Sequence, residues 1–170
     1  MARKVYFAFH YQKDIVRVNQ VRNSDITKED RELAGFYDAG LWEKSKKSGD
    51  EAIRRMIKDG LDGTTVTVFL LGEETAKRPW VKYELEESWK RGNGLVSIYI
   101  NDLLDFERKT TLRGSDILDD YTYTLNGVKY KLSTWFKTYD WKGDNGYENF
   151  GEWVEETAQI AEDLKNKGIM

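Results

Sequence analysis

Short apolar runs alternate with amphipathic stretches along the N-terminal part of the chain. The apolar runs have the length and composition of strands buried in a sheet, and they lie at Lys4–Phe9, Thr65–Leu71 and Leu95–Ile100. Apolar residues that recur at helical spacing predict helices at Asp14–Arg22, from Gly49-Asp50 to Gly60 or Gly63, and at Pro79–Arg91. This alternation predicts a flavodoxin-like α/β fold, in which helices flank a central, mainly parallel sheet.

The segment between the first two predicted helices has a weaker pattern. Asn23–Asp30 is rich in polar and turn-forming residues and predicts a loop. In Phe36–Trp42, apolar pairs flank Asp38-Ala39-Gly40, and we interpret this stretch as a short second strand or a structured loop. The expected order of elements up to Ile100 is therefore β-α-(β)-α-β-α-β.

The C-terminal part of the chain changes character. Asp102–Asp120 is predicted to be rich in loops. Tyr121–Leu125 and Val128–Leu132 flank Asn126-Gly127, a dipeptide suited to the type I′ turn of a β-hairpin. A final helix is expected to end at Lys167 and to begin at Glu148 or Glu152. We expect a single domain, with a core at about 1–118 and an extension at about 119–170.

Composition excludes several classes of function. With 34% charged and 39% hydrophobic residues, the chain has the balance of a soluble globular protein. Its net charge of −3 argues against nucleic acid as a partner. The absence of cysteine excludes disulfides, thiolate catalysis and Cys-ligated zinc.

No apolar run reaches about 18 residues, so no membrane span is expected. Met1–Lys4 leads straight into a strand without the features of a signal peptide, which favours a cytoplasmic protein.

The best candidate for chemistry lies where the second apolar run meets a helix. Trp80 and Glu84 are four residues apart and therefore lie on the same helix face, one turn apart. In open α/β sheets, ligands bind at the carboxyl ends of the strands, where strands turn into helices. The single histidine, His10, follows the first strand at the same edge of the sheet. No G-x-G-x-x-G, P-loop or G-x-S-x-G motif is present.

These motifs resemble the TIR family of bacteria, and in particular the TIR-like branch of Thoeris antiphage defence systems. The resemblance rests on the strand Thr65–Gly72, on the W-x-x-x-E spacing of Trp80 and Glu84, and on Arg91–Leu95. Lys4–Asn19 fits the first strand and helix of the family. The tail resembles the extension of the Thoeris branch, whereas Phe36–Trp42 departs from the second strand and loop of animal TIR domains.

The resemblance implies that Glu84 is the catalytic residue of an NAD-cleaving enzyme. Such an enzyme breaks the nicotinamide–ribose bond, and a carboxylate beneath the ribose stabilises the oxocarbenium-like transition state. NAD would be a substrate, and neither a cofactor nor a metal would be needed. The product would be a cyclic ADP-ribose isomer that activates a separate effector protein. A phage-derived trigger and a homo-oligomer are compatible with this role.

The resemblance also suggests residues that bind substrate. Phe9, His10 and Tyr11 would contribute to the NAD pocket, and an aromatic ring among them would stack on a base. Trp80 would act mainly as a scaffold for Glu84. Arg17, Asn19 and Arg22 on the following helix could reach the phosphates, and solvated helix faces explain these residues equally well. Asp38 could contact the ribose, and a turn explains it equally well.

Two other functions remain open at this point. A non-enzymatic TIR scaffold would signal through TIR–TIR contacts, and its assembly would be insensitive to Glu84→Gln. A flavodoxin-like binder or phospho-receiver is the second alternative. A receiver needs a phospho-acceptor Asp at the end of the central strand, but that strand ends in Leu70-Leu71-Gly72.

Overall fold

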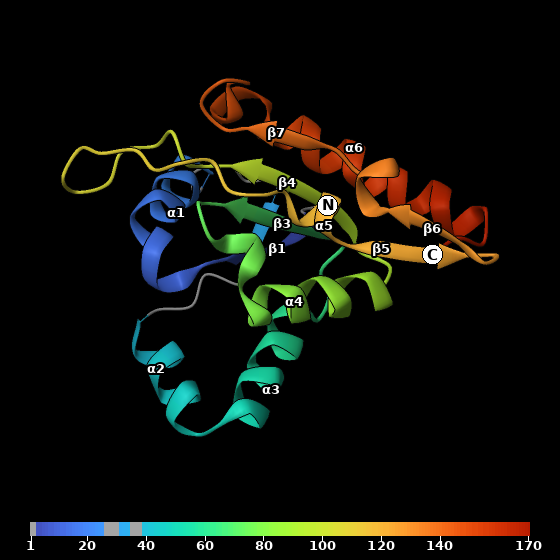
Figure 1. Cartoon of the computed structure of the whole chain (residues 1–170), viewed down its shortest axis with the longest axis horizontal. Helices are drawn as coiled ribbons and strands as arrows, with labels where there is room; N and C mark the ends of the chain where they lie inside the picture. The colour runs from blue at the N-terminus through green and yellow to red at the C-terminus, as the bar shows by residue number, and fades with distance from the viewer. Residues whose placement is uncertain (1–2, 26–30, 35–38) are drawn as a thin grey trace.

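The computed structural model describes residues 3–25, 31–34 and 39–170, and a parallel sheet lies at its centre (Figure 1). The sheet is five-stranded, in the order β2-β1-β3-β4-β7. Each neighbouring pair of strands is parallel. The strands are β1 (Arg3–Phe9), β2 (Arg31–Ala34), β3 (Val66–Leu71), β4 (Gly94–Tyr99) and β7 (Thr138–Asp140). This strand order is that of a flavodoxin-like fold, which confirms the predicted fold class.

Helices α1 (Tyr11–Asp25) and α6 (Gly146–Asn166) cover one face of the sheet. Side chains alternate along each strand, so every second residue points to this face. Val5, Phe7, Val68 and Leu70 from the strands pack there with Val18 and Val21 of α1 and with Phe150 and Val154 of α6. The predicted final helix is thereby confirmed, and its apolar side closes the core.

Helices α3 (Asp50–Leu61) and α4 (Pro79–Lys90) cover the opposite face. The intervening residues of the strands, among them Tyr6, Ala8 and Phe69, pack against Ile57 of α3 and Leu85 of α4. A further helix, α2 (Ala39–Lys47), lies beside α3 at the outer side of this layer (Figure 1). A short 3-10 helix, η1 (Thr75–Lys77), precedes α4. Pro79 occupies the first turn of α4, where its missing N–H leaves no helical bond unmade.

The predicted hairpin is present as a separate two-stranded antiparallel sheet, β5 (Thr122–Leu125) and β6 (Val128–Lys131). Asn126 and Gly127 have φ values of 52° and 80°, as a type I′ turn requires. Helix α5 (Ile117–Asp120) precedes the hairpin, and the 3-10 helix η2 (Leu132–Thr134) follows it. The hairpin packs on the outer end of α4, where the Trp89 ring contacts Tyr123 with ring centroids 4.7 Å apart.

Three short elements differ from the prediction, namely β2, α2 and β7. The second strand is β2, upstream of the predicted position, and Leu41-Trp42 lies in α2 rather than in a strand or loop. Phe36–Asp38 lies outside the described residues. Strand β7 was not predicted. Both β2 and β7 are edge strands of three or four residues, too short to show a period of apolar positions.

Candidate active site

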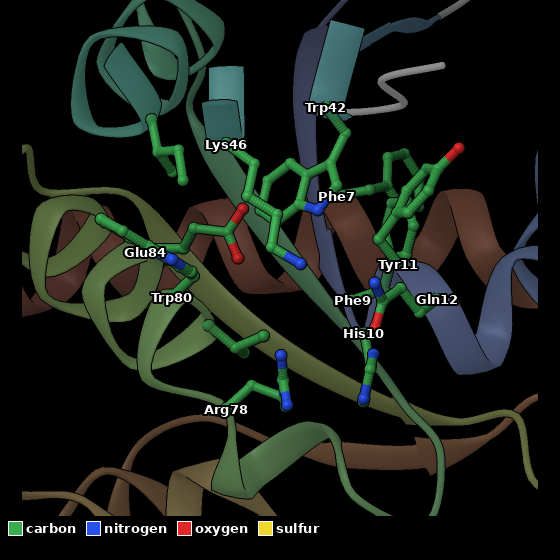
Figure 2. Close-up of a pocket in the computed structure, with 12 residues that line it drawn as sticks. Phe7, Phe9, His10, Tyr11, Gln12, Trp42, Lys46, Arg78, Trp80 and Glu84 are labelled. Atoms are coloured by element: carbon green, nitrogen blue, oxygen red, sulfur yellow. The ribbon is translucent and has the colours of Figure 1, made fainter. Parts of the chain in front are cut away.

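A cleft opens beside the carboxyl ends of β1 and β3, on the face covered by α3 and α4. Its volume is about 700 Å³, the open mouth included. Side chains converge on it from the β1–α1 junction, from α2 and from α4 (Figure 2). The residues that line it are Phe7, Phe9, His10, Tyr11, Gln12, Trp42, Lys46, Ile53, Arg78, Trp80, Val81 and Glu84. Ligand sites of doubly wound folds occupy this position.

Glu84 supplies the carboxyl group in the wall of the cleft, where it points toward the open space (Figure 2). The residue is only 7% exposed. The buried hydroxyl of Tyr6 donates a hydrogen bond of 2.6 Å to Oε1 of Glu84. Burial raises the pKa of Glu84 to about 8, although the bond from Tyr6 opposes this change. The carboxyl group is therefore largely protonated in the empty cleft at neutral pH.

Trp80 lies one turn before Glu84, and both side chains line the cleft. The Trp80 ring meets Tyr83 edge to face, with centroids 5.8 Å apart. The guanidinium of Arg54, on α3, lies 5.9 Å from the centroid of the Trp80 ring. These contacts hold the ring between α3 and α4, where it forms part of the cleft surface.

An aromatic wall stands opposite α4. Phe9 ends β1, and its ring centroid lies 6.3 Å from that of Tyr11. Tyr11 stacks in turn on Trp42 of α2, with centroids 5.9 Å apart and planes at 23°. His10 lies between Phe9 and Tyr11 and is 5% exposed. Burial, and secondarily the positive charge of Arg78, lowers the pKa of His10, so its imidazole is neutral at pH 7 and above.

Two cations, Lys46 and Arg78, also line the cleft. Lys46 extends from the last turn of α2, and Arg78 is the residue immediately before α4 (Figure 2). Both residues are exposed. Aromatic surfaces, cations and one carboxyl group thus surround a single opening. Such a site can stack a planar ring, attract phosphate groups and stabilise developing positive charge.

Comparisons with known proteins agree with this geometry. The family model described as Thoeris protein ThsB, TIR-like domain, matches residues 6–105, which include every residue that lines the cleft. A protein of Bacillus cereus (strain MSX-D12), named "Putative cyclic ADP-D-ribose synthase ThsB1", is 35% identical over 192 aligned residues. The match spans 91% of this chain and 100% of that protein. The chain belongs to the ThsB family of TIR-like proteins.

In this ThsB-family domain, some of the residues that the sequence suggested as contacts for substrate lie away from the cleft. Asn19 is exposed on α1 and is not among the residues that line the opening. Arg22 is also exposed on α1. Asp38 lies outside the described residues. Arg17 is buried, and its guanidinium donates to the carbonyl oxygens of Leu103 and Lys109 at 2.9 and 3.0 Å.

Sequence reasoning missed seven of the residues that line the cleft, and among them are Trp42, Lys46 and Arg78. Trp42 and Lys46 both come from α2, which was not predicted as a helix. Lys46 belongs to a cluster of lysines at the end of that helix, a weak signal in itself. Arg78 precedes Pro79 in the motif that identified Glu84, so its proximity to the strand-to-helix turn was a usable signal.

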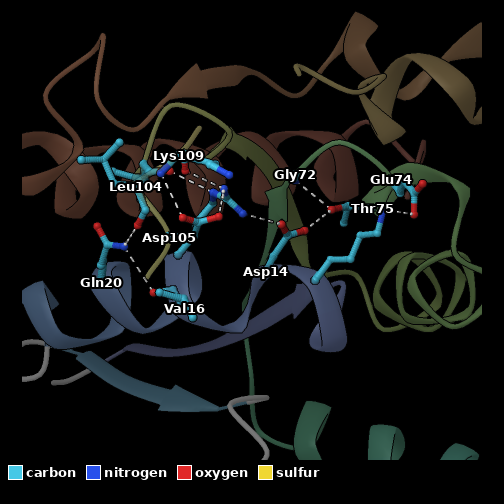
Figure 3. A network of polar contacts seen from close by, with 12 residues as sticks. Asp14, Val16, Gln20, Gly72, Glu74, Thr75, Leu104, Asp105 and Lys109 are labelled. Carbon is cyan, nitrogen blue, oxygen red and sulfur yellow. Dashed lines mark hydrogen bonds and ion pairs between the residues drawn. The ribbon is translucent and has the colours of Figure 1, made fainter. Parts of the chain in front are cut away.

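A polar network fixes the end of β3 next to the cleft (Figure 3). The Thr75 hydroxyl accepts from the backbone N–H of Gly72 at 2.8 Å and donates to Oδ2 of Asp14 at 3.3 Å. Asp14 is buried, and burial raises its pKa, whereas nearby Arg17 lowers it. The network joins the first turns of α1 to the β3–α4 connection, so the relative position of these two segments next to the cleft is fixed.

The described residues contain no cluster of His, Cys, Asp or Glu that could hold a metal ion. Within the same part of the chain, none of the helices has the length and apolar composition that a membrane crossing requires.

Proposed function

We propose that this protein is an NAD-cleaving enzyme that forms a cyclic isomer of ADP-ribose. One observation carries the proposal: a buried glutamate, Glu84, faces an aromatic cleft at the ligand-binding edge of the sheet in a ThsB-family chain. The B. cereus relative, whose name refers to cyclic ADP-D-ribose synthesis, supports the same activity. NAD would be consumed as a substrate and would not serve as a cofactor.

Cleavage breaks the bond between C1′ of the ribose and the nicotinamide nitrogen. The electron pair of that bond goes to the nitrogen, which loses its positive charge, and positive charge develops on the ribose. An ionised Glu84 next to the ribose would stabilise this charge. A nucleophilic atom elsewhere in the ADP-ribose then bonds to C1′ and loses its proton, which closes the ring. Water at the same position would instead give linear ADP-ribose.

The protonated state of Glu84 in the empty cleft fits this role. The nicotinamide ring of NAD is cationic, and a cation near a carboxyl group favours its ionised form. Substrate binding would therefore lower the pKa of Glu84 from about 8 and generate the carboxylate where it is needed. The charge pair would form inside a partly closed cleft, where electrostatic attraction is stronger than in bulk water.

The remaining cleft residues would position the substrate. The stacked pair Tyr11 and Trp42 offers a planar surface for nicotinamide or adenine. Lys46 and Arg78 would attract the pyrophosphate. Phe9 and His10 complete the wall between these groups. The cyclic product would act on a separate effector protein, and a phage-derived signal would trigger its synthesis.

The test compares wild type with Glu84→Gln, because the amide keeps the size of the side chain and removes its charge. Lysates of infected cells that express either protein are incubated with NAD, and nucleotides are identified by mass spectrometry. Glu86→Gln is the matched control, since Glu86 is exposed on the same helix and does not line the cleft. We expect a cyclic ADP-ribose species with wild type and with Glu86→Gln only. Equal nucleotide profiles in all samples would refute the proposal and favour a TIR scaffold.

A further inference from the structure

Tyr6 is a buried phenol whose hydroxyl ends at the Glu84 carboxyl group. It lies in the middle of β1 and is 0% exposed. The alternation of β1 directs it to the face covered by α4, and its hydroxyl donates to Oε1 of Glu84 at 2.6 Å. Tyr6 does not line the cleft. Its hydroxyl therefore contacts Glu84 from the core side of α4 and not from the cleft.

The two polar groups satisfy each other in the buried layer between the sheet and α4. A buried hydroxyl without a partner and a buried carboxyl without a partner are both costly. The structure brings them together from positions 78 residues apart in the sequence. Among the described residues, Oε1 of Glu84 has this single hydrogen bond and Oε2 has none, so Oε2 is left for a ligand in the cleft.

Other charged or titratable groups face the cleft, but they act from its open side. They are His10 and Tyr11 at the β1–α1 junction, Lys46 of α2 and Arg78 before α4. Arg54 of α3 contacts Trp80. Burial raises the pKa of Glu84, and the hydrogen bond from Tyr6 is the interaction that lowers it. A donor in contact with a carboxyl group favours its ionised form.

We propose that Tyr6 is a positioning residue for the proposed reaction, and that its buried hydroxyl fixes Glu84 in the wall of the cleft. This inference rests on the proposed role of Glu84. Tyr6 itself does not contact substrate. It holds one carboxyl oxygen so that the other faces the cleft, and it favours the ionised state that the chemistry requires.

Tyr6→Phe tests the proposal, because it removes the hydroxyl and keeps the ring. The control is Tyr139→Phe, since the Tyr139 hydroxyl also donates to a glutamate, Glu156, at 2.7 Å but lies in β7, away from the cleft. We expect the pH profile of kcat/KM for Tyr6→Phe to move upward by about one pH unit. The loss at about pH 7 would be roughly tenfold and would largely disappear at high pH. Tyr139→Phe should keep the wild-type profile.

A second readout needs no turnover. The carboxyl carbon of Glu84 is followed by NMR in protein labelled with 13C-glutamate, and its signal is assigned by its absence in Glu84→Gln. Its titration should move upward in Tyr6→Phe by the same amount as the kinetic profile. Unchanged titration in Tyr6→Phe, or an equal loss of activity at every pH, would overturn the inference.

The two proposals fail in different ways. Full product formation by Glu84→Gln would overturn both the catalytic role of Glu84 and the role of Tyr6 that depends on it. An inactive Glu84→Gln combined with a wild-type pH profile for Tyr6→Phe would overturn the role of Tyr6 alone. If Tyr6→Phe does not fold, the wild-type protein answers the question: its Tyr6 hydroxyl proton should exchange slowly and shift as Glu84 titrates, and a rapidly exchanging proton would refute the bond.

Discussion

Tyr11 and Trp42 stack across the mouth of the cleft, with ring centroids 5.9 Å apart and planes at 23°. Tyr11 begins α1, immediately after the first strand, whereas Trp42 belongs to α2. The pair therefore joins two helices that follow one another in the sequence. It places a broad aromatic surface opposite Trp80 and Glu84.

Trp42→Ala should weaken substrate binding more than it slows the chemical step. Removing one ring of a stacked pair forfeits about 0.5–1.5 kcal/mol beyond the loss of apolar contact area. We expect KM for NAD to rise roughly tenfold and kcat to change by less than about threefold. Steady-state kinetics would check this. Trp135→Ala is a useful control, because Trp135 packs near the hairpin and not in the cleft. A large fall in kcat with unchanged KM would contradict the assigned role.

Glu84 should make the stability of the protein depend on pH. Its pKa is raised from 4.5 to about 8, so the folded state binds more protons than the unfolded state between these values. The stability associated with the protonated group is present below about pH 4.5 and is lost as the pH rises toward 8. Each tenfold difference between the acid dissociation constants of Glu84 in the folded and unfolded states corresponds to about 1.4 kcal/mol in the free energy of unfolding.

Glu84→Gln should therefore gain stability relative to wild type as the pH rises from about 5 to about 8. Denaturant unfolding at several pH values would measure the difference, with Glu86→Gln as the exposed control on the same helix. A constant difference between Glu84→Gln and wild type across this range would show that Glu84 ionises normally in the folded protein.

Much of the site was accessible from the sequence because its signals are local. The strand-to-helix turn, the first-turn proline and the spacing of Trp80 and Glu84 lie within a short stretch, and helical periodicity alone places the two side chains together. Phe9, His10 and Tyr11 could likewise be placed at the carboxyl end of the first strand. The structure brings all five residues to one cleft.

The parts that sequence reasoning missed depend on contacts between distant segments. Trp42 and Lys46 reach the cleft only because α2 folds next to α3, and nothing near them in the sequence indicates that packing. Tyr6 resembles any apolar strand residue until its hydroxyl meets Glu84. Strand β7 pairs with β4 over only three residues, which a pattern of apolar positions cannot detect.

Gly72→Ala should destabilise the protein, because the end of β3 leaves no room for a side chain. A Cβ at this position would lie 2.1 Å from Oδ2 of Asp14, a buried residue in the network next to the cleft. We expect a loss of roughly 1–3 kcal/mol in the free energy of unfolding. Gly143→Ala is the control, since the nearest atom to its Cβ would be at 3.4 Å, an ordinary contact distance.

The double variant Gly72→Ala with Asp14→Ala should cost less than the sum of the two single variants, because the clash and the buried carboxyl are removed together. Chemical denaturation of the four proteins in this cycle would measure the coupling. Strict additivity would indicate that the loop moves aside and that Gly72 does not need to approach Asp14.

Binding of a cationic nicotinamide ring should release a proton from Glu84. At about pH 7 the free carboxyl, with a pKa of about 8, is mostly protonated, and a nearby cation favours its ionised form. A carbocyclic NAD analogue keeps the cationic ring and cannot be cleaved, so calorimetry in buffers of different ionisation enthalpy would count protons at equilibrium. We expect release approaching one proton per site with wild type and none with Glu84→Gln. The reduced dinucleotide, whose nicotinamide ring is neutral, should release fewer protons than the cationic analogue. Equal release by both ligands would mean that the ring charge does not reach Glu84, and that the nicotinamide binds elsewhere in the cleft.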